Sequence, residues 1–293
     1  MIRLFLNGVV AEVAEKGAEM RVFQTKDAKN HLWSGDEQVW GEVTPILFPV
    51  VGRLQNGTVR IDGQELPIPM HGFAKDMTFT VQEQETDHCT LFLEDSAETR
   101  KIYPFAFRLS VSHHIIGKGF VTEYSVENLG NSVMPFVIGG HPGFICPMNA
   151  GEVFSDYHII FEKEEEGRNL LCMPDGLMGA EEVIDLGLDH RTLALSYDTF
   201  SHKGTLVFSG LNSRSVKLIH QRTGRGIRFS FPASPVLAIW THSTANAPYI
   251  CLEPWNGLPA MVNETGDFED KPFHVALEPG GLFRAGYLVE LLH

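Results

Sequence analysis

The sequence predicts an all-β protein, a sandwich built from many antiparallel strands. Most of its assignable segments are short, alternate between apolar and polar residues, and are rich in β-branched or aromatic side chains. Turn residues separate these segments, and no amphipathic stretch persists for the roughly 11 residues of a typical helix. Barrels of alternating strands and helices and doubly wound sheets need a helix after nearly every strand, so the pattern disfavours both.

The strand assignments begin with a hairpin. Residues 58–61 are followed by Asp62-Gly63 and then by residues 64–66, and an Asp-Gly pair tolerates the positive φ angles of a type I′ turn. Two segments, residues 151–154 and 180–184, are candidates for a single turn of helix. The further strand candidates are residues 77–82, 88–94, 105–116, 120–127, 133–138, 157–162, 205–208, 216–220, 226–231, 237–241, 249–252 and 282–291.

We expect one continuous domain over residues 1–293. The 28 glycines and 16 prolines are spread along the chain, and no low-complexity stretch or fixed-period repeat divides it. A single large β domain is compatible with this length, because about 150 residues per domain is only a prior.

The charge balance argues against nucleic-acid and membrane partners. The chain has 23 basic and 37 acidic side chains, a formal net charge of −14, which repels phosphodiesters and anionic lipids. No run approaches the ~20 apolar residues of a membrane helix, and the first residues lack the pattern of a secretory signal. The four cysteines, at positions 89, 146, 172 and 251, form no Cys-x-x-Cys pair, which favours reduced thiols in the cytoplasm.

Four motifs combine potentially catalytic side chains with apolar neighbours, and two of them precede residue 80. The first is the apolar run of residues 44–53, whose last residue is Arg53. This arginine either ends a solvated strand or directs its five N–H donors at a ligand. The second places His71 before Gly72, which lets backbone and ligand approach closely, although a histidine in this setting is more often structural.

The other two motifs contain the candidate acid and base. His141 lies among three glycines and a proline directly after an apolar strand, and a histidine titrates near neutral pH, so it suits a general acid. Glu253 ends an apolar run beside Trp255. An outward, solvated carboxylate is the alternative for Glu253, but burial would raise its pKa into the working range of a base. Trp255 offers a flat apolar face of the kind on which sugar rings pack.

In this order, the four motifs resemble those of the aldose 1-epimerase (galactose mutarotase) family, most closely its bacterial branch of about this length. The match extends from Trp40 to the Leu-Glu-Pro-Gly of residues 277–280 and the strand after it, which is nearly the whole chain. The markers are Pro-x-Leu-Phe-Pro-x-x-Gly-Arg at 45–53, His-Gly-Phe at 71–73, Gly-His-Pro-Gly-Phe at 140–144, and Ile-Trp at 239–240 followed by Cys-Leu-Glu-Pro-Trp at 251–255.

The resemblance implies a large antiparallel β-sandwich, the galactose mutarotase-like supersandwich, with a small-molecule sugar in an open cleft across one sheet. It implies that Glu253 takes the proton from the anomeric hydroxyl and that His141 protonates the ring oxygen. The sugar ring then opens, the C1–C2 bond rotates, and reclosure gives the other anomer. Arg53 and His71 would hold sugar oxygens, and Trp255 would contact the sugar.

A carboxylate and an imidazole suffice for these two proton transfers, so we expect no cofactor and no metal. The sequence shows no cluster of metal ligands. The adjacent His113 and His114 place their rings on opposite faces of a strand, where they cannot bind one ion. Trp40 and Phe144 are further candidates for cleft walls, against the more common place of aromatic rings in a core.

The sequence departs from the family at two sugar-binding positions. Many members have an acidic residue before the strand that here spans residues 205–208, but this chain has Ser-His-Lys-Gly at 201–204, with Asp198 upstream. A glutamine of the best-known members is replaced by Ala238. Both departures leave the identity of the sugar open. The sequence does not indicate the oligomeric state.

Three functions therefore compete. The first is a mutarotase for a free aldohexose such as galactose or glucose, and the second is a mutarotase for a phosphorylated hexose. The second would need several cations around a dianion, for which Arg53 and Lys203 are candidates. The third is a non-catalytic sugar-binding protein that acts as a sensor. The matched acid and base, His141 and Glu253, favour an enzyme over a binding protein.

Overall fold

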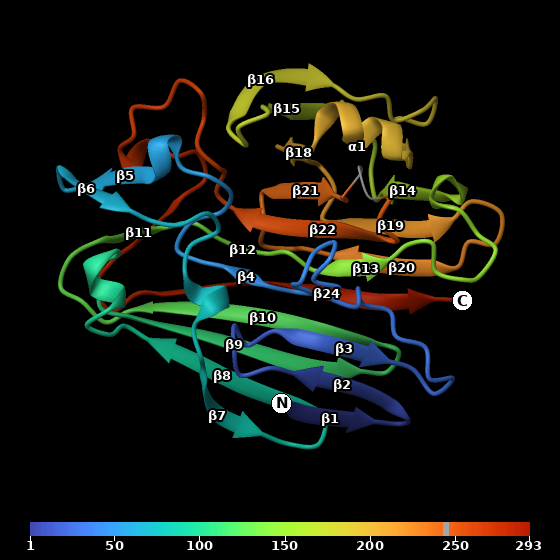
Figure 1. The fold of residues 1–293 in the computed structure, drawn as a ribbon, viewed down its shortest axis with the longest axis horizontal. Coiled ribbons are helices and arrows are strands. Elements are labelled where there is room, and N and C mark those ends of the chain that lie inside the picture. Colours follow the sequence, from blue (N-terminus) through green and yellow to red (C-terminus); the bar gives the residue numbers. More distant parts are fainter. Residues whose placement is uncertain (243–245) are drawn as a thin grey trace.

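Two large antiparallel sheets dominate the computed structural model, which describes residues 1–242 and 246–293 (Figure 1). The nine-stranded sheet has the order β17 (Thr192–Ala194), β14 (Tyr157–Phe161), β19 (Ser215–His220), β20 (Gly226–Ser230), β24 (Leu282–Leu292), β10 (Gly119–Asn128), β9 (Phe107–Ile116), β8 (His88–Glu94) and β7 (Thr80–Gln84). The eight-stranded sheet has the order β16 (Met178–Val183), β15 (Arg168–Cys172), β18 (Leu206–Ser209), β21 (Val236–Trp240), β22 (Tyr249–Asn256), β12 (Ile138–Gly140) and β4 (Ile46–Leu47), and its β13 (Gly143–Ile145) also pairs with β22.

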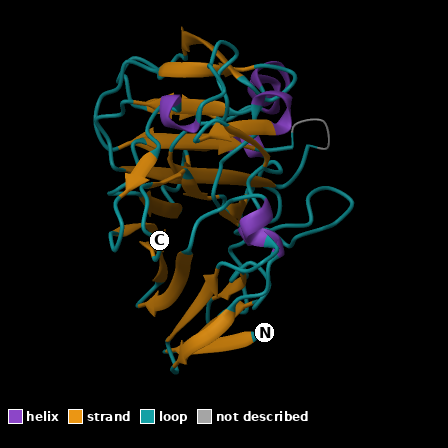
Figure 2. Cartoon of the chain, turned by 90° about the vertical axis from the view of Figure 1, so that its left-hand side faces the viewer, coloured by secondary structure: helices purple, strands orange, loops and turns teal. Residues whose placement is uncertain are grey.

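Smaller sheets and a few helical turns complete the chain, and Figure 2 shows how little helix lies among the strands. The small sheets are β1 (Ile2–Leu6) with β2 (Val9–Val13) and β3 (Met20–Gln24), β5 (Thr58–Ile61) with β6 (Gln64–Pro67), and β11 (Met134–Phe136) with β23 (Val275–Leu277). The helix α1 spans Tyr197–Lys203, and short 3₁₀ turns lie at Gln55–Gly57, Ala74–Asp76, Thr99–Lys101, Phe154–Asp156 and Phe268–Asp270.

The two large sheets face each other across an aromatic interior. Phe161 of β14 packs on Phe208 of β18 with ring centroids 5.3 Å apart, and Phe144 of β13 packs on Phe229 of β20 at 5.9 Å. The β1–β3 sheet packs on the other part of the nine-stranded sheet, where β1 contacts β8 and β9. This arrangement confirms the predicted all-β antiparallel sandwich.

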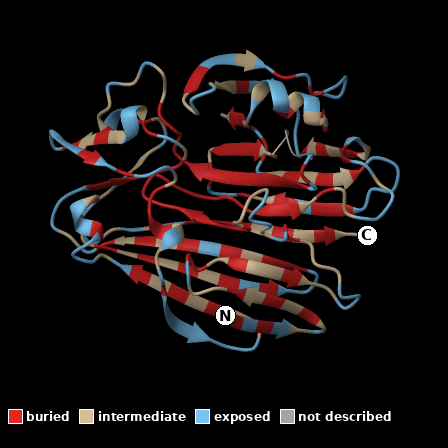
Figure 3. Ribbon diagram, viewed as in Figure 1, coloured by how far each residue is buried: buried red, intermediate tan, exposed pale blue. Residues whose placement is uncertain are grey.

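The core follows from the alternation of apolar residues along the strands. In β9 every second residue from Phe107 to Ile115 is buried and the residues between them are more exposed, as the two-residue period of a strand requires. Figure 3 shows this alternation as stripes along the lower strands. One hydrophobic cluster contains buried residues from Ile2 to Leu291. The single domain over residues 1–293 stays a prediction, which this shared core supports.

Local turn chemistry explains the predicted hairpin. Asp62 and Gly63 have φ angles of 50° and 75°, which is the conformation that an Asp-Gly turn favours, and they join β5 to β6. The strand prediction for residues 88–94 coincides with β8, and most of the others differ only at their ends. No helix of the described residues is long and apolar enough to cross a membrane.

Several local predictions differ from the structure. Residues 180–184 lie largely in the edge strand β16 and not in a helical turn, because pairing with β15 decides their conformation. The helix α1 has only seven residues, too few for a visible period, although Ser196 caps it by accepting a hydrogen bond from the Asp198 N–H. Strands β1–β4, β13, β15–β17 and β23 were not predicted, and the helical turn predicted for residues 151–154 is instead a 3₁₀ turn at Phe154–Asp156. The strand predicted for 249–252 continues to Asn256 as β22.

Candidate functional site

Glu253 lies inside the eight-stranded sheet and not at a strand end. It belongs to β22, whose eight residues are all buried, and it pairs with Ala238 of the neighbouring β21. The side chain of Glu253 is only 2% exposed. The middle of a sheet therefore fixes the position of this carboxyl group and removes it from water, which is the arrangement that a buried base requires.

His141 follows β12 and contacts Glu253. Its backbone N–H donates to the Pro45 carbonyl at 3.0 Å, which holds the turn against the segment before β4. Its Nε2 lies 3.2 Å from Oε2 of Glu253, a close contact that is not aligned as a hydrogen bond. Gly139 lets β12 pack closely on β22, because a Cβ at that position would lie 2.4 Å from the Trp255 ring. We call Glu253 and His141 the buried pair.

Burial favours the uncharged form of both members of the buried pair. It raises the pKa of Glu253 well above its usual range. Burial, together with the neighbouring His71, lowers the pKa of His141 well below its usual range. Burial therefore favours the uncharged form of each group, a carboxylic acid and a neutral imidazole, and the proton of the carboxyl group is the one that can pass to the other member.

The buried pair also has unsatisfied polar atoms. Within the described residues, Oε2 of Glu253 and Nδ1 of His141 are buried without a hydrogen-bond partner. An unpaired buried polar atom costs stability, so such atoms call for an explanation, and a catalytic role is one of the common ones. The pair has free hydrogen-bonding capacity for a polar ligand.

His71 occupies a strained turn next to the buried pair. Its φ angle is 66°, and the following Gly72 has a φ angle of 74° and could not carry a side chain, because a Cβ would lie 2.0 Å from the Phe48 carbonyl oxygen. Positive φ at a residue other than glycine costs energy and is common at functional sites. The His71 and His141 ring centroids are 5.6 Å apart.

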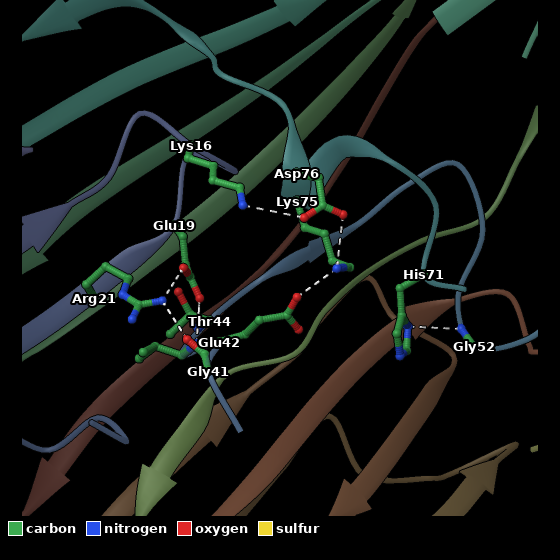
Figure 4. A network of polar contacts seen from close by, with 11 residues as sticks. Lys16, Glu19, Arg21, Gly41, Glu42, Thr44, Gly52, His71, Lys75 and Asp76 are labelled. Carbon is green, nitrogen blue, oxygen red and sulfur yellow. Dashed lines mark hydrogen bonds and ion pairs between the residues drawn. The ribbon is translucent and has the colours of Figure 1, made fainter. Parts of the chain in front are cut away.

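Two hydrogen bonds with the Gly52 backbone hold His71, and the one to its ring nitrogen fixes the tautomer (Figure 4). The His71 N–H donates to the Gly52 carbonyl at 3.0 Å, and the Gly52 N–H donates to Nδ1 of His71 at 3.1 Å. Burial lowers the pKa of His71 to about 4, and the charges of Lys75 and Arg53 add to this effect. Since Nδ1 accepts a hydrogen bond, the neutral ring carries its proton on Nε2 and presents a fixed donor there.

Arg53 directly follows Gly52 and carries an uncompensated charge. Its side chain is exposed and forms no hydrogen bond or ion pair within the described residues, while its backbone carbonyl accepts a hydrogen bond from the Ala260 N–H at 2.9 Å. Its charge reaches His71, whose pKa it lowers. The guanidinium group is thus available for a ligand at the His71 side of the buried pair.

Aromatic rings flank the buried pair, but not all of the predicted ones do so. Trp40 packs on His141 with ring centroids 4.8 Å apart, Trp240 packs on the same ring at 5.5 Å, and both indoles are only partly buried. Trp255 is 3% exposed, and its indole N–H opposes the rise in the pKa of Glu253 without forming an aligned hydrogen bond. Phe144 lies in the core.

A polar network that the sequence analysis did not detect supports this site (Figure 4). The Glu19 carboxylate accepts hydrogen bonds from the N–H groups of Val43 and Thr44, at 2.5 and 2.9 Å, just before the Pro45 carbonyl that holds His141. Lys75 forms ion pairs with Glu42 at 2.7 Å and with Asp76 at 3.1 Å. No local pattern predicts these contacts, because the partners are far apart in the sequence. Glu19 and Val43 are separated by 24 residues, and Lys75 and Glu42 by 33.

The structure brings together two groups of side chains that could hold a metal ion, where the sequence indicated none. The ligand atoms of His141, Cys251 and Glu253 lie within 4.8 Å of one another, and so do those of Asp87, His88 and His114. Cys251 belongs to the first group because it shares a face of β22 with Glu253, two residues along the strand. As predicted, His113 and His114 diverge, since His113 is buried and His114 is exposed.

Of the predicted site residues, Glu253, His141 and His71 are gathered in one place, with Arg53 next to His71 and Trp255 next to Glu253. Lys203 is different, because it forms an ion pair with Glu182 at 2.6 Å. Asp198 lies on α1 with its side chain 81% exposed. Neither residue contacts the buried pair.

Comparisons with known proteins agree on one family. The sequence profile of the aldose 1-epimerase family matches residues 2–289. The plasmid and chromosomal LacX proteins of Lactococcus lactis subsp. lactis are each 33% identical to this chain, over 94% of either sequence. A galactose mutarotase related enzyme of Lactobacillus acidophilus has a TM-score of 0.93 and 27% identity, over 99% of this chain and 97% of that one. A galactose mutarotase-like protein of Lactobacillus casei ATCC 334 has a TM-score of 0.93 and 28% identity, over 100% of both chains.

Proposed function

Because the chain belongs to the aldose 1-epimerase family, we propose that it is a mutarotase that interconverts the α and β anomers of a free aldohexose such as galactose or glucose. One observation carries the proposal beyond the family: an imidazole nitrogen and a carboxylate oxygen, both buried, lie 3.2 Å apart. Mutarotation needs one proton donor and one proton acceptor at neighbouring oxygens, and the buried pair offers both.

In the proposed reaction, the ionised Glu253 takes the proton of the anomeric hydroxyl while the protonated His141 delivers a proton to the ring oxygen. The bond between C1 and the ring oxygen breaks, C1 becomes an aldehyde, and the C1–C2 bond rotates. Reclosure on the other face of the aldehyde reverses both transfers and restores the pair. Each positioned proton transfer contributes typically about 10²- to 10⁴-fold in rate.

The single proton of the buried pair suits this cycle. A neutral pair and a carboxylate–imidazolium pair differ only by the movement of that proton between Glu253 and His141. The pair therefore reaches the reactive form without exchanging protons with water. Its open hydrogen-bonding capacity matches the two sugar oxygens that change their protonation state.

His71 and Arg53 are proposed to bind the sugar. The fixed Nε2–H of His71 can donate to a ring or hydroxyl oxygen, and the Arg53 guanidinium can donate to neighbouring hydroxyls. The partly buried Trp40 and Trp240 offer aromatic faces next to His141. Trp255 is proposed to contact the sugar next to Glu253 and to favour the ionised carboxylate through its indole N–H.

The charges around the site favour a free sugar over a phosphorylated one. A phosphate dianion is usually bound by several converging cations. Lys203 is occupied by Glu182, and Lys75 is occupied by Glu42 and Asp76. Arg53 alone of these cations has no anionic partner among the described residues. A cytoplasmic location, in keeping with four cysteines that are all free thiols, belongs to the same proposal.

The experiment is polarimetry of fresh α-D-glucose and α-D-galactose as they relax to their anomeric mixtures. We expect wild-type protein to accelerate the relaxation and Glu253→Gln to lose about 100-fold or more. Glu278→Gln, the same substitution at an exposed glutamate, serves as the control and should keep full activity. Acceleration of hexose 6-phosphates alone would favour the phosphosugar alternative. Sugar binding without acceleration of any of these substrates would favour the non-catalytic binding protein.

A further inference from the structure

A cavity of about 650 Å³ lies away from the candidate site, at the end of the sandwich where the C-terminus is drawn in Figure 1. None of its lining residues belongs to the candidate site. Its walls come from the β1–β2 turn and the start of β2, the turn after β3, the β9–β10 turn, the segment between β13 and β14 with the start of β14, the β19–β20 turn and the end of β24. Its volume falls within the range of about 300–1,000 Å³ that is typical of small-molecule sites.

Four cations line this cavity in a protein whose formal net charge is −14. Lys26 and Lys29 come from the turn after β3, Lys118 from the β9–β10 turn, and Arg225 from the β19–β20 turn. None of the four forms an ion pair within the described residues, although Lys29 donates a hydrogen bond to the Asn149 side chain at 2.7 Å. Opposite charges attract, so four cations around one cavity favour an anionic ligand there.

The acidic groups at the cavity do not neutralise this charge. Asp27 is its one acidic side chain, and it is engaged within its own turn, where it accepts a hydrogen bond from the Thr25 hydroxyl at 2.6 Å. Glu152 does not line the cavity, and its carboxylate is engaged by the lining residues Asn149 and Tyr157, each of which donates a hydrogen bond to it. Four cations thus line the cavity with one acidic side chain, which makes no ion pair with a cavity lysine or arginine in the described residues.

The remaining walls supply apolar surface. Val9, Met148, Leu291 and Leu292 line the cavity beside the cations. A cavity with converging charged donors and an apolar wall fits an anion that carries an organic body, because the donors fix the charged end and the apolar wall covers the rest. Three lysines provide point charges and one arginine provides a planar fork, and both are common phosphate-binding groups.

We propose that this cavity binds a small organic phosphate, a phosphate monoester with a body of about the size of a sugar, at a site separate from the buried pair. Inorganic phosphate carries the same charged group and is the alternative ligand for these cations. The proposal does not depend on mutarotase activity, because it concerns binding at other residues.

The test is calorimetric titration of the full-length protein with glucose 6-phosphate, inorganic phosphate and glucose at low ionic strength. The double variant Lys118→Ala/Arg225→Ala removes two cavity cations. The matched control, Lys163→Ala/Arg222→Ala, removes two exposed cations that do not line the cavity and changes the net charge equally. Unfolding curves of both double variants establish that each is folded. Glu253→Gln reports on binding at the buried pair, and Arg53→Ala on binding next to His71.

We expect glucose 6-phosphate to bind more tightly than inorganic phosphate and to lose about tenfold or more in affinity in the cavity variant, since charged hydrogen bonds are lost. The control pair, Glu253→Gln and Arg53→Ala should keep this affinity. Equal binding of the two phosphates would reassign the cavity to inorganic phosphate and overturn the organic-ligand part. Absence of binding at millimolar concentration, equal loss in both double variants, or loss in Arg53→Ala alone would overturn the proposal.

Discussion

Replacing Glu253 by glutamine should stabilise the protein at neutral pH while removing the proposed base. Burial raises the pKa of Glu253, so the folded protein keeps this carboxyl group protonated at a pH where the unfolded chain ionises it. A group with a raised folded pKa contributes its full stability below the unfolded pKa and loses that contribution as the pH rises toward the folded pKa. A glutamine has no proton to release and escapes this loss.

The size of the effect follows from the pH interval. Each unit between the unfolded pKa and the working pH, while the folded carboxyl group stays neutral, favours unfolding of the wild type by about 1.4 kcal/mol. Starting from an ordinary glutamate pKa of 4.5, the gain of the variant is at most about 3.5 kcal/mol at pH 7. At pH 4.5 and below the gain should largely vanish, because the carboxyl group is then protonated in much of the unfolded chain as well.

Urea unfolding of wild type and Glu253→Gln at pH 4.5 and pH 7 measures this difference, with equal m-values as the condition for comparing free energies of unfolding. Glu278→Gln should be neutral at both pH values, since its side chain is exposed. A Glu253→Gln variant that is destabilised at pH 7 would refute the reasoning. It would show that Glu253 is ionised in the folded protein and stabilised by a protonated His141.

Three further predictions concern the same regions. The kcat/KM for mutarotation should be constant through neutral pH. Its decrease toward acid pH should begin well below pH 6.5, because His141 takes up an additional proton only there. A decrease that begins at or above pH 6.5 would contradict this prediction. Gly72→Ala should cost about 2–4 kcal/mol in urea unfolding, through positive φ and the clash with the Phe48 carbonyl, and it should lower activity by displacing His71; an unchanged midpoint would argue against the turn. Glu264→Gln should cost about 3–5 kcal/mol, because it leaves the buried Lys271 without its partner at 3.0 Å, and a neutral result would show that this ion pair is dispensable.

The fold class could be predicted from local sequence, and so could the residues of the candidate site. The two-residue period of β9 and the Asp62-Gly63 turn are properties of neighbouring residues, and the structure preserves both. His141 and Glu253 were identified because glycine, proline and aromatic neighbours mark them. The edge strand β16 and the short helix α1 escaped, because strand pairing decides the first and tertiary packing outweighs a seven-residue propensity in the second.

What only the tertiary structure decided is how distant segments meet. The contact of 3.2 Å between His141 and Glu253 exists because β12 and β22 are neighbours in one sheet, although the two residues are far apart in the sequence. The same holds for Glu19 beneath the segment before β4, and for the four cations of the proposed phosphate cavity, which come from three separate turns. Burial, and with it the pKa of Glu253, depends on what the other strands cover. A sequence specifies its local conformations through adjacent residues, whereas charge, burial and proximity at a site arise only when the sheets close over one another.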